Sequence, residues 1–123
     1  MNLTEFTDQQ KQAVVDLLVL GMYADANLDL IEDEKARQVL DAIQFSSDSA
    51  RQYFIDASFA RARKNGAAAI TARSYVSEIA GSFPTPAMRR QVYSALEDCL
   101  MSDQKISGKE SELLLIVSEE FKL

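Results

Sequence analysis

Carboxylate side chains recur at one spacing in two stretches of the chain, residues 25–34 and 103–112. The stretches align without a gap and pair Asp25 with Asp103, Leu28 with Ile106, Asp29 with Ser107, Glu32 with Glu110, and Glu34 with Glu112. Carboxylate oxygens are the ligands that Ca²⁺ and Mg²⁺ prefer in proteins. The residue types are therefore those of a divalent cation site for Ca²⁺ or Mg²⁺, with Asp25, Asp29 and Glu32 as candidate oxygen ligands that lie close in sequence.

The first acidic stretch has the opening pattern of an EF-hand loop, with Asp25, Asn27 and Asp29 at alternate positions. An EF-hand also needs glycine at the sixth position and a bidentate glutamate at the twelfth. Those positions hold Leu30 and Ala36, and the second stretch also lacks the final glutamate. The sequence therefore argues against an EF-hand and leaves a simpler cation site open.

Helix capping explains part of the same spacing without any ligand. Asp29 and Ser107 are expected N-caps, and Glu32 and Glu110 stand where the reciprocal residue of a capping box belongs. The alternative to a cation site is therefore that these residues only cap helices.

Asp25 and Asp103 are harder to explain by capping, because each is expected just past the C-terminal end of a helix. The helix dipole disfavours a negative charge at that end. Each aspartate must therefore accept N–H hydrogen bonds in a tight connection or bind a cation. If the acidic stretches bind a ligand, these two aspartates are therefore the residues expected to bind it.

Apolar spacing and capping signals predict helices almost throughout the chain and no strand. Thr7 and Gln10 form a capping box before a helix over about 8–24, and a second helix runs from Asp29 to about Gln44. The Ser46–Ser49 cluster caps a third helix that stops at Gly66 in the left-handed conformation, with Ala50, Tyr53, Phe54, Ala57 and Ala60 on its buried face. Residues 67–70 are either a loop or a short helix.

Three more helices are expected in the second half of the chain. Thr71 is the expected N-cap of the fourth, which buries Tyr75, Val76, Ile79, Ala80 and Phe83. Thr85 and Pro86 open the fifth, and the sixth runs from Ser107 to Phe121. The prediction is an all-α compact bundle of six or seven helices.

An internal duplication is predicted from the same alignment. Identical core residues align at Val14 with Val92, Leu18 with Leu96, and Val39 with Val117. Residues 1–123 are expected to form a single domain, with a first helical hairpin over about 8–44, central helices over about 48–83 and a second hairpin over about 86–121. The hairpins would be related by an approximate two-fold axis.

Composition limits the classes of function. The 123-residue chain has no histidine, no tryptophan and one cysteine, Cys99, which is expected in the core. Nucleophilic triads are therefore unavailable, no glycine-rich phosphate loop accompanies the acids, and no enzymatic activity is expected. The chain has no long apolar run and no signal-peptide pattern at Met1, so we expect a soluble cytoplasmic protein.

The net charge of −6 argues against binding to DNA. Residues 1–48 and 95–123 are acidic, whereas residues 49–94 are basic. Either the basic middle offsets the acidic ends within one fold, or it forms a patch for an anionic partner such as RNA or lipid. That patch would comprise Arg51, Arg61, Arg63, Lys64, Arg73, Arg89 and Arg90; peripheral membrane association has no other support in the sequence.

The last predicted helix is more apolar than one face can hide, since residues 113–117 are all apolar. Either this helix is central in the bundle, or Leu113, Leu115 and Ile116 contribute to an interface with a protein partner or a second copy of the chain, as in a homodimer.

Residues 23–32, Tyr-Ala-Asp-Ala-Asn-Leu-Asp-Leu-Ile-Glu, resemble the motif of the TerB-like tellurite-resistance family. Residues 101–110, Met-Ser-Asp-Gln-Lys-Ile-Ser-Gly-Lys-Glu, resemble it again. The usual glycine after the first aspartate is replaced by Ala26 and Gln104, which suggests a divergent member.

The resemblance covers nearly the whole chain and implies an all-helical, cytoplasmic, stress-response module associated with tellurite resistance and with envelope or phage defence. It also implies clustered acidic residues that bind a divalent metal, here Asp25, Glu32, Asp103 and Glu110, with Asp29, Glu34 and Glu112 as secondary acidic residues. No enzymatic activity is established for the family. We therefore expect a non-catalytic module that binds protein partners, with a divalent cation at the acidic connections. The alternative is a purely structural interaction domain whose acidic residues only cap helices.

Overall fold

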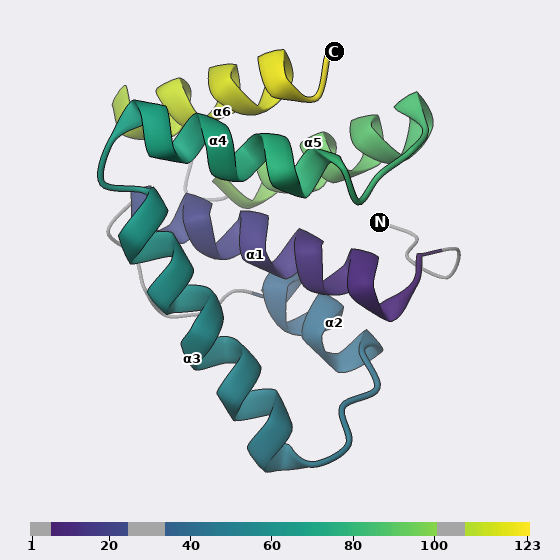
Figure 1. Cartoon of the computed structure of the whole chain (residues 1–123). Helices are drawn as coiled ribbons and strands as arrows, with labels where there is room; N and C mark the ends of the chain where they lie inside the picture. Colours follow the sequence, from purple (N-terminus) through teal and green to yellow (C-terminus); the bar gives the residue numbers. More distant parts are fainter. Residues whose placement is uncertain (1–5, 25–33, 101–107) are drawn as a thin grey trace.

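The computed structural model describes residues 6–24, 34–100 and 108–123, without the side chains of residues 24, 34–36, 99 and 108–110. These residues form helices α1 (Asp8–Ala24), α2 (Glu34–Ala42), α3 (Asp48–Asn65), α4 (Ala69–Ala80), α5 (Pro86–Leu100) and α6 (Gly108–Glu120) (Figure 1). The described part contains no strand, so the predicted all-α compact bundle is confirmed. None of its helices is long and apolar enough to cross a membrane. The internal duplication stays a prediction.

Helix α1 lies at the centre of the bundle, with α4, α5 and α6 on one side and α2 and α3 on the other (Figure 1). Its residues 13–22 are all buried except Asp16. A helix that is covered all round is apolar all round, which is why α1 carries valine and leucine on every face. Helix α1 therefore supplies the centre of the hydrophobic core.

The start of α1 is fixed by the predicted capping box. The Gln10 amide donates to Thr7 Oγ1 at 3.1 Å, and the Thr7 amide donates to Gln10 Oε1 at 2.9 Å. The Gln10 side chain also donates to the Ser82 carbonyl, and the Lys11 ammonium donates to the carbonyl of Ala42. The first turn of α1 is thereby tied to the end of α2 and to the connection between α4 and α5.

The connection between α4 and α5 is held by Phe83 and Arg89. Phe83 is fully buried between the rings of Phe6 and Phe121, with centroid distances of 5.8 and 6.2 Å. The Arg89 guanidinium donates to three carbonyls, those of Phe83, Ala80 and Phe121. These carbonyls lie near the ends of α4 and α6, where a helix leaves its last carbonyls without intrahelical partners, so one cation binds both helix ends; the Ala80 carbonyl also accepts from the Phe83 amide. The predicted cap of α5 is confirmed, since the Met88 amide donates to Thr85 Oγ1 at 3.2 Å.

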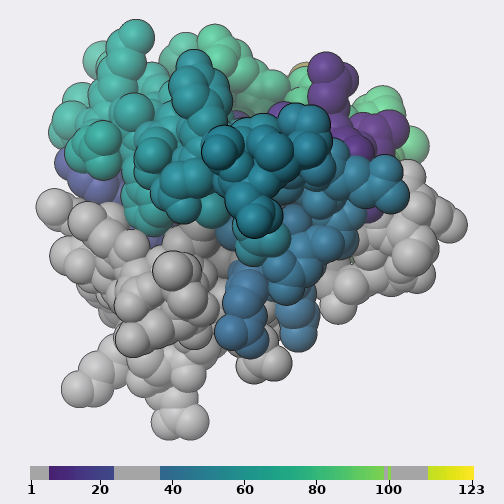
Figure 2. All heavy atoms as spheres, turned by 90° about the horizontal axis from the view of Figure 1, so that it is seen from below, coloured from purple at the N-terminus to yellow at the C-terminus, as the bar shows by residue number. Residues whose placement is uncertain are grey.

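The predicted buried face of α3 is wrong. Tyr53 is 77% exposed, Ala60 is exposed, and Ala50, Phe54 and Ala57 are only half-buried. The buried residues of α3 are Ser58 and Ala62, because only its second half packs closely against α1. Figure 2, which views the molecule from below, shows α3 on the outer surface with α2 beside it.

Two capping predictions near the end of α3 are also wrong. Gly66 has φ of −82°, not the left-handed conformation; a Cβ there would lie 2.8 Å from the Tyr23 ring, so glycine permits close packing. Helix α4 begins at Ala69 with Ala68 as its N-cap, and the Thr71 hydroxyl donates to the carbonyls of Asn65 and Ala68. The prediction that the Ser46–Ser49 cluster caps α3 is confirmed, and the structure identifies Ser47 as the N-cap, whose side chain accepts from the Ala50 amide.

The other helix predictions agree with the structure where it can test them. The five residues predicted to be buried on and after α4 are all buried, namely Tyr75, Val76, Ile79, Ala80 and Phe83. Helix α2 ends at Ala42, slightly before the predicted Gln44. The predicted caps Asp29 and Ser107 lie outside the described residues.

Candidate functional site at one end of the bundle

Most of the predicted cation ligands lie outside the described residues, namely Asp25, Asp29, Glu32 and Asp103. Glu34 is the first residue of α2 and Glu110 belongs to the first turn of α6, but their side chains are not described. Glu112 is exposed on α6. Among the described side chains, no three acidic, histidine or cysteine residues come together as a possible metal site.

The described helix ends do show where the two acidic connections begin. A Cβ at Gly21 would lie 3.0 Å from Leu96 Cδ1 and 3.1 Å from Leu100 Cδ2. The last turn of α1 therefore packs directly on the last turn of α5. Residue 25 follows the end of α1, and residue 101 follows the end of α5. The two acidic connections consequently begin at neighbouring helix ends.

A third helix ends at the same place. Gly66, which follows α3, contacts the Tyr23 ring near the end of α1. In Figure 1 these ends lie on the left side of the molecule, together with the start of α4. The last carbonyls of a helix carry partial negative charge. Negative ends of α1, α3 and α5 thus meet where both acidic connections start, and a bound cation would offset this charge.

A polar cluster joins α1 and α3 inside the bundle, and it was not predicted from the sequence. Asp16 Oδ1 accepts hydrogen bonds from Ser58 Oγ and from Arg61 Nη2, both at 2.7 Å. Ser58 is fully buried, and the Asp16 side chain is 16% exposed. A charged residue within the apolar run of α1 was the available signal, because such residues are rarely buried without a partner. The cluster holds α3 on α1 through polar contacts.

The charges in this cluster shift two pKa values. Burial works against the charge of Arg61, but the hydrogen bond and charge of Asp16, with smaller contributions from Tyr75, outweigh it and raise the pKa of Arg61. Burial, reinforced by the Asp16 charge and opposed by Arg61, raises the pKa of Tyr75 to about 12. Among the described residues, the buried Tyr75 hydroxyl has no hydrogen-bond partner.

Replacing Tyr75 with phenylalanine is therefore expected to raise the free energy of unfolding by about 1 kcal/mol, since it removes a buried polar group without a partner. The gain should be larger at alkaline pH. In the wild type the folded-state pKa lies above the ordinary value of 10.0, so stability falls as pH rises from about 10 to about 12.

Urea unfolding at neutral pH measures the first effect, with the exposed Tyr53→Phe variant as control. A destabilised Tyr75→Phe variant would show that the hydroxyl is satisfied in solution.

Comparison with known proteins identifies the family. The family described as tellurite resistance protein TerB matches residues 12–123, which include five of the six helices entirely and most of α1. The chain belongs to the TerB family. Neither the curated proteins nor the solved structures searched gave a match. The match spans both acidic connections of this TerB domain and confirms the family that the sequence resembled.

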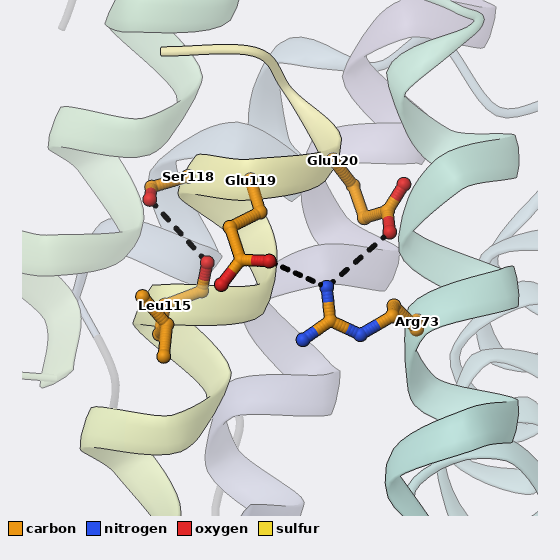
Figure 3. Close-up of polar contacts among 5 residues, drawn as sticks. All are labelled: Arg73, Leu115, Ser118, Glu119 and Glu120. Carbon is orange, nitrogen blue, oxygen red and sulfur yellow. Dashed lines mark hydrogen bonds and ion pairs between the residues drawn. The ribbon is translucent and has the colours of Figure 1, made fainter.

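Among the described residues, three of the seven basic residues in the middle of the TerB domain pair with acids from its ends. Arg51 contacts Asp41 at 2.9 Å, and Arg61 contacts Asp16. Arg73 bridges α4 and α6 by contacting Glu119 at 2.9 Å and Glu120 at 3.5 Å (Figure 3). These pairs support the interpretation that the basic middle offsets the acidic ends. They engage Arg51, Arg61 and Arg73, and Arg89 binds carbonyls, so these four arginines do not form a freely available patch.

The three predicted interface residues of α6 differ in exposure. Leu113 and Ile116 are 5% and 3% exposed and therefore belong to the core of the TerB domain. Leu115 is 57% exposed, and its carbonyl accepts a hydrogen bond from the Ser118 hydroxyl (Figure 3). Leu115 alone of the three lies on the surface for a partner, and the predicted interface rests on it.

Proposed function

We propose that this TerB-family chain is a non-catalytic module that binds protein partners and holds one divalent cation between its two acidic connections. The observation that carries the proposal is the packing of Gly21 on Leu96 and Leu100, which starts both connections at neighbouring helix ends. Residues distant in sequence can thereby contribute to one site. Asp25 and Asp103 are the proposed central ligands, with Asp29, Glu32 and Glu110 completing an oxygen ligand set.

Electrostatics favours a shared cation over two unbound acidic connections. Like charges that lie close together raise the energy of the ionised forms. The negative ends of α1 and α5 add to this repulsion. Ca²⁺ or Mg²⁺ would remove it and link the two halves of the chain.

Thermal unfolding with and without Ca²⁺ and Mg²⁺ tests the proposal. A cation that binds only the folded state stabilises it by about 2.7 kcal/mol at one hundred times Kd. We expect this stabilisation in the wild type and its loss in Asp25→Asn/Asp103→Asn. The control is Glu78→Gln/Asp56→Asn, which removes two charges from exposed acids on α4 and α3 and should keep the response.

The alternative function is that of a structural interaction domain whose acidic connections only cap helices. The formed capping box at Thr7 and Gln10 favours it, because this chain does use that motif. A destabilised Asp25→Asn/Asp103→Asn variant, together with a wild type that ignores both cations, would support this alternative and contradict the cation site.

A further inference from the structure

The connection between α3 and α4 forms a corner of the molecule where basic and apolar side chains are exposed together. Arg63 and Lys64 are exposed in the last turn of α3, and residues 67–70, Ala-Ala-Ala-Ile, are exposed as the chain turns into α4. Ile70 is 83% exposed, more than any other large hydrophobic side chain in the described residues. We call residues 63, 64 and 67–70 the α3–α4 corner.

Unlike the neighbouring arginines, the basic residues of this corner form no ion pair within the part of the chain that the structure describes. Arg51, Arg61 and Arg73 form ion pairs within the domain, and Arg89 binds carbonyls. No ion pair of Arg63 or Lys64 occurs among the described residues. Their place in the last turn of α3 suits the helix dipole, which accounts for basic residues there but does not neutralise them.

The helix dipole accounts for the two basic residues, but it does not account for the exposed side chain of Ile70. A single exposed hydrophobic residue is ordinary, but here it continues a run of three exposed alanines beside the exposed side chains of Arg63 and Lys64. The corner thus offers a small apolar surface next to positive charge, which complements a segment that is acidic and carries an aliphatic side chain.

We propose that the α3–α4 corner docks an acidic segment of a partner protein, with Arg63 and Lys64 contacting carboxylates and Ile70 contacting an aliphatic residue. The charge of the whole molecule favours a protein over an anionic membrane. The chain has a net charge of −6, and Gly66 at this corner packs on Tyr23, next to the start of the first acidic connection. An extended anionic bilayer would face more of this acidic molecule, whereas a narrow peptide can contact the corner alone.

This inference deepens the partner-binding half of the proposed function and does not depend on the cation. A chain without a cation response can still bind an acidic peptide here, and a chain that binds Ca²⁺ can still lack this docking surface. The two failures are therefore distinguishable.

Fluorescence anisotropy with a labelled peptide rich in glutamate, with leucine at every fourth position, tests the docking surface. We expect saturable, salt-sensitive binding to the wild type and none to the same peptide with glutamine in place of glutamate. Arg63→Gln/Lys64→Gln should weaken binding roughly tenfold, as expected from the loss of two charge pairs. Ile70→Ser should weaken it as well.

Matched controls separate the corner from net charge and general hydrophobicity. Arg90→Gln/Lys122→Gln removes the same charge from other exposed sites, and Tyr53→Ser removes another exposed large hydrophobic side chain, from the first half of α3. Both should bind like the wild type, and circular dichroism should show all variants folded.

Several results would overturn the proposal. These are no binding of the acidic peptide, equal loss in the Arg90→Gln/Lys122→Gln control, and cosedimentation with phosphatidylserine vesicles that depends on the corner. Self-association that the corner substitutions abolish would likewise assign the surface to a second copy of the chain.

Discussion

Replacing Phe83 with alanine is expected to lower the free energy of unfolding by about 3–5 kcal/mol, the usual cost of deleting a fully buried ring. Phe83 is 0% exposed and contacts the rings of Phe6 and Phe121. Its loss would leave a cavity where α4, α5 and α6 meet. Because domains of this kind are stable by only about 5–15 kcal/mol, the variant should lose a large share of its stability.

Urea unfolding followed by circular dichroism measures this loss, with Leu115→Ala as the control. Leu115 is 57% exposed, so its truncation should change stability by less than about 1 kcal/mol. Similar losses in the two variants would mean that Phe83 does not occupy the core as described.

Replacing Asp16 with alanine is expected to cost about 3 kcal/mol, because it leaves the fully buried Ser58 hydroxyl and the Arg61 guanidinium without their acceptor. Arg61 is 39% exposed and can turn partly toward water, which keeps the cost below that of a wholly buried pair. The loss should affect α3 first, since Asp16 connects that helix to α1.

A double-mutant cycle of Asp16→Ala with Arg61→Ala measures the coupling between the two side chains. Asp41→Ala provides the control, since its ion pair with Arg51 lies on the surface and should contribute about 0–1 kcal/mol. Hydrogen exchange should show faster exchange in α3 than in α4 for Asp16→Ala. Uniform exchange in both helices, with no coupling in the cycle, would contradict the assigned role of the cluster.

Much of the fold could be predicted because helix boundaries and core positions depend on local signals. The Thr7 and Thr85 caps and the apolar spacing of α4 each require only a few neighbouring residues, and these predictions agree with the structure. The central position of α1 was less evident, although its residues 13–22 are apolar on nearly every face.

Helix α3 could not be predicted correctly because a polar contact determines which face it buries. Ser58 and Arg61 bind Asp16 of α1, and this orients the helix with Tyr53 toward solvent. An apolar stripe read from the sequence assumes that hydrophobic burial orients each helix, and here a polar cluster overrides that assumption. Gly66 was misassigned for a related reason, since its need for glycine comes from Tyr23, a residue distant in sequence.

The candidate site was predicted at the level of residue type but not of location. The repeated acids and the TerB motif both pointed to residues 25–34 and 103–112, and the family match is consistent with that motif. What the sequence could not supply is the packing of Gly21 against Leu96 and Leu100, which brings the starts of these segments together. Only that contact turns two acidic connections into one proposed site.

Isothermal titration calorimetry of Ca²⁺ into the wild type, Asp25→Asn and Asp103→Asn tests most directly whether the two acidic connections share one cation site. A shared site predicts one ion per chain in the wild type and loss of binding in each single variant, because both connections contribute ligands. Glu78→Gln, an exposed acid on α4, should bind like the wild type. Two ions per chain, with one retained in each single variant, would contradict a shared site, and no binding heat with either Ca²⁺ or Mg²⁺ would contradict the cation site altogether.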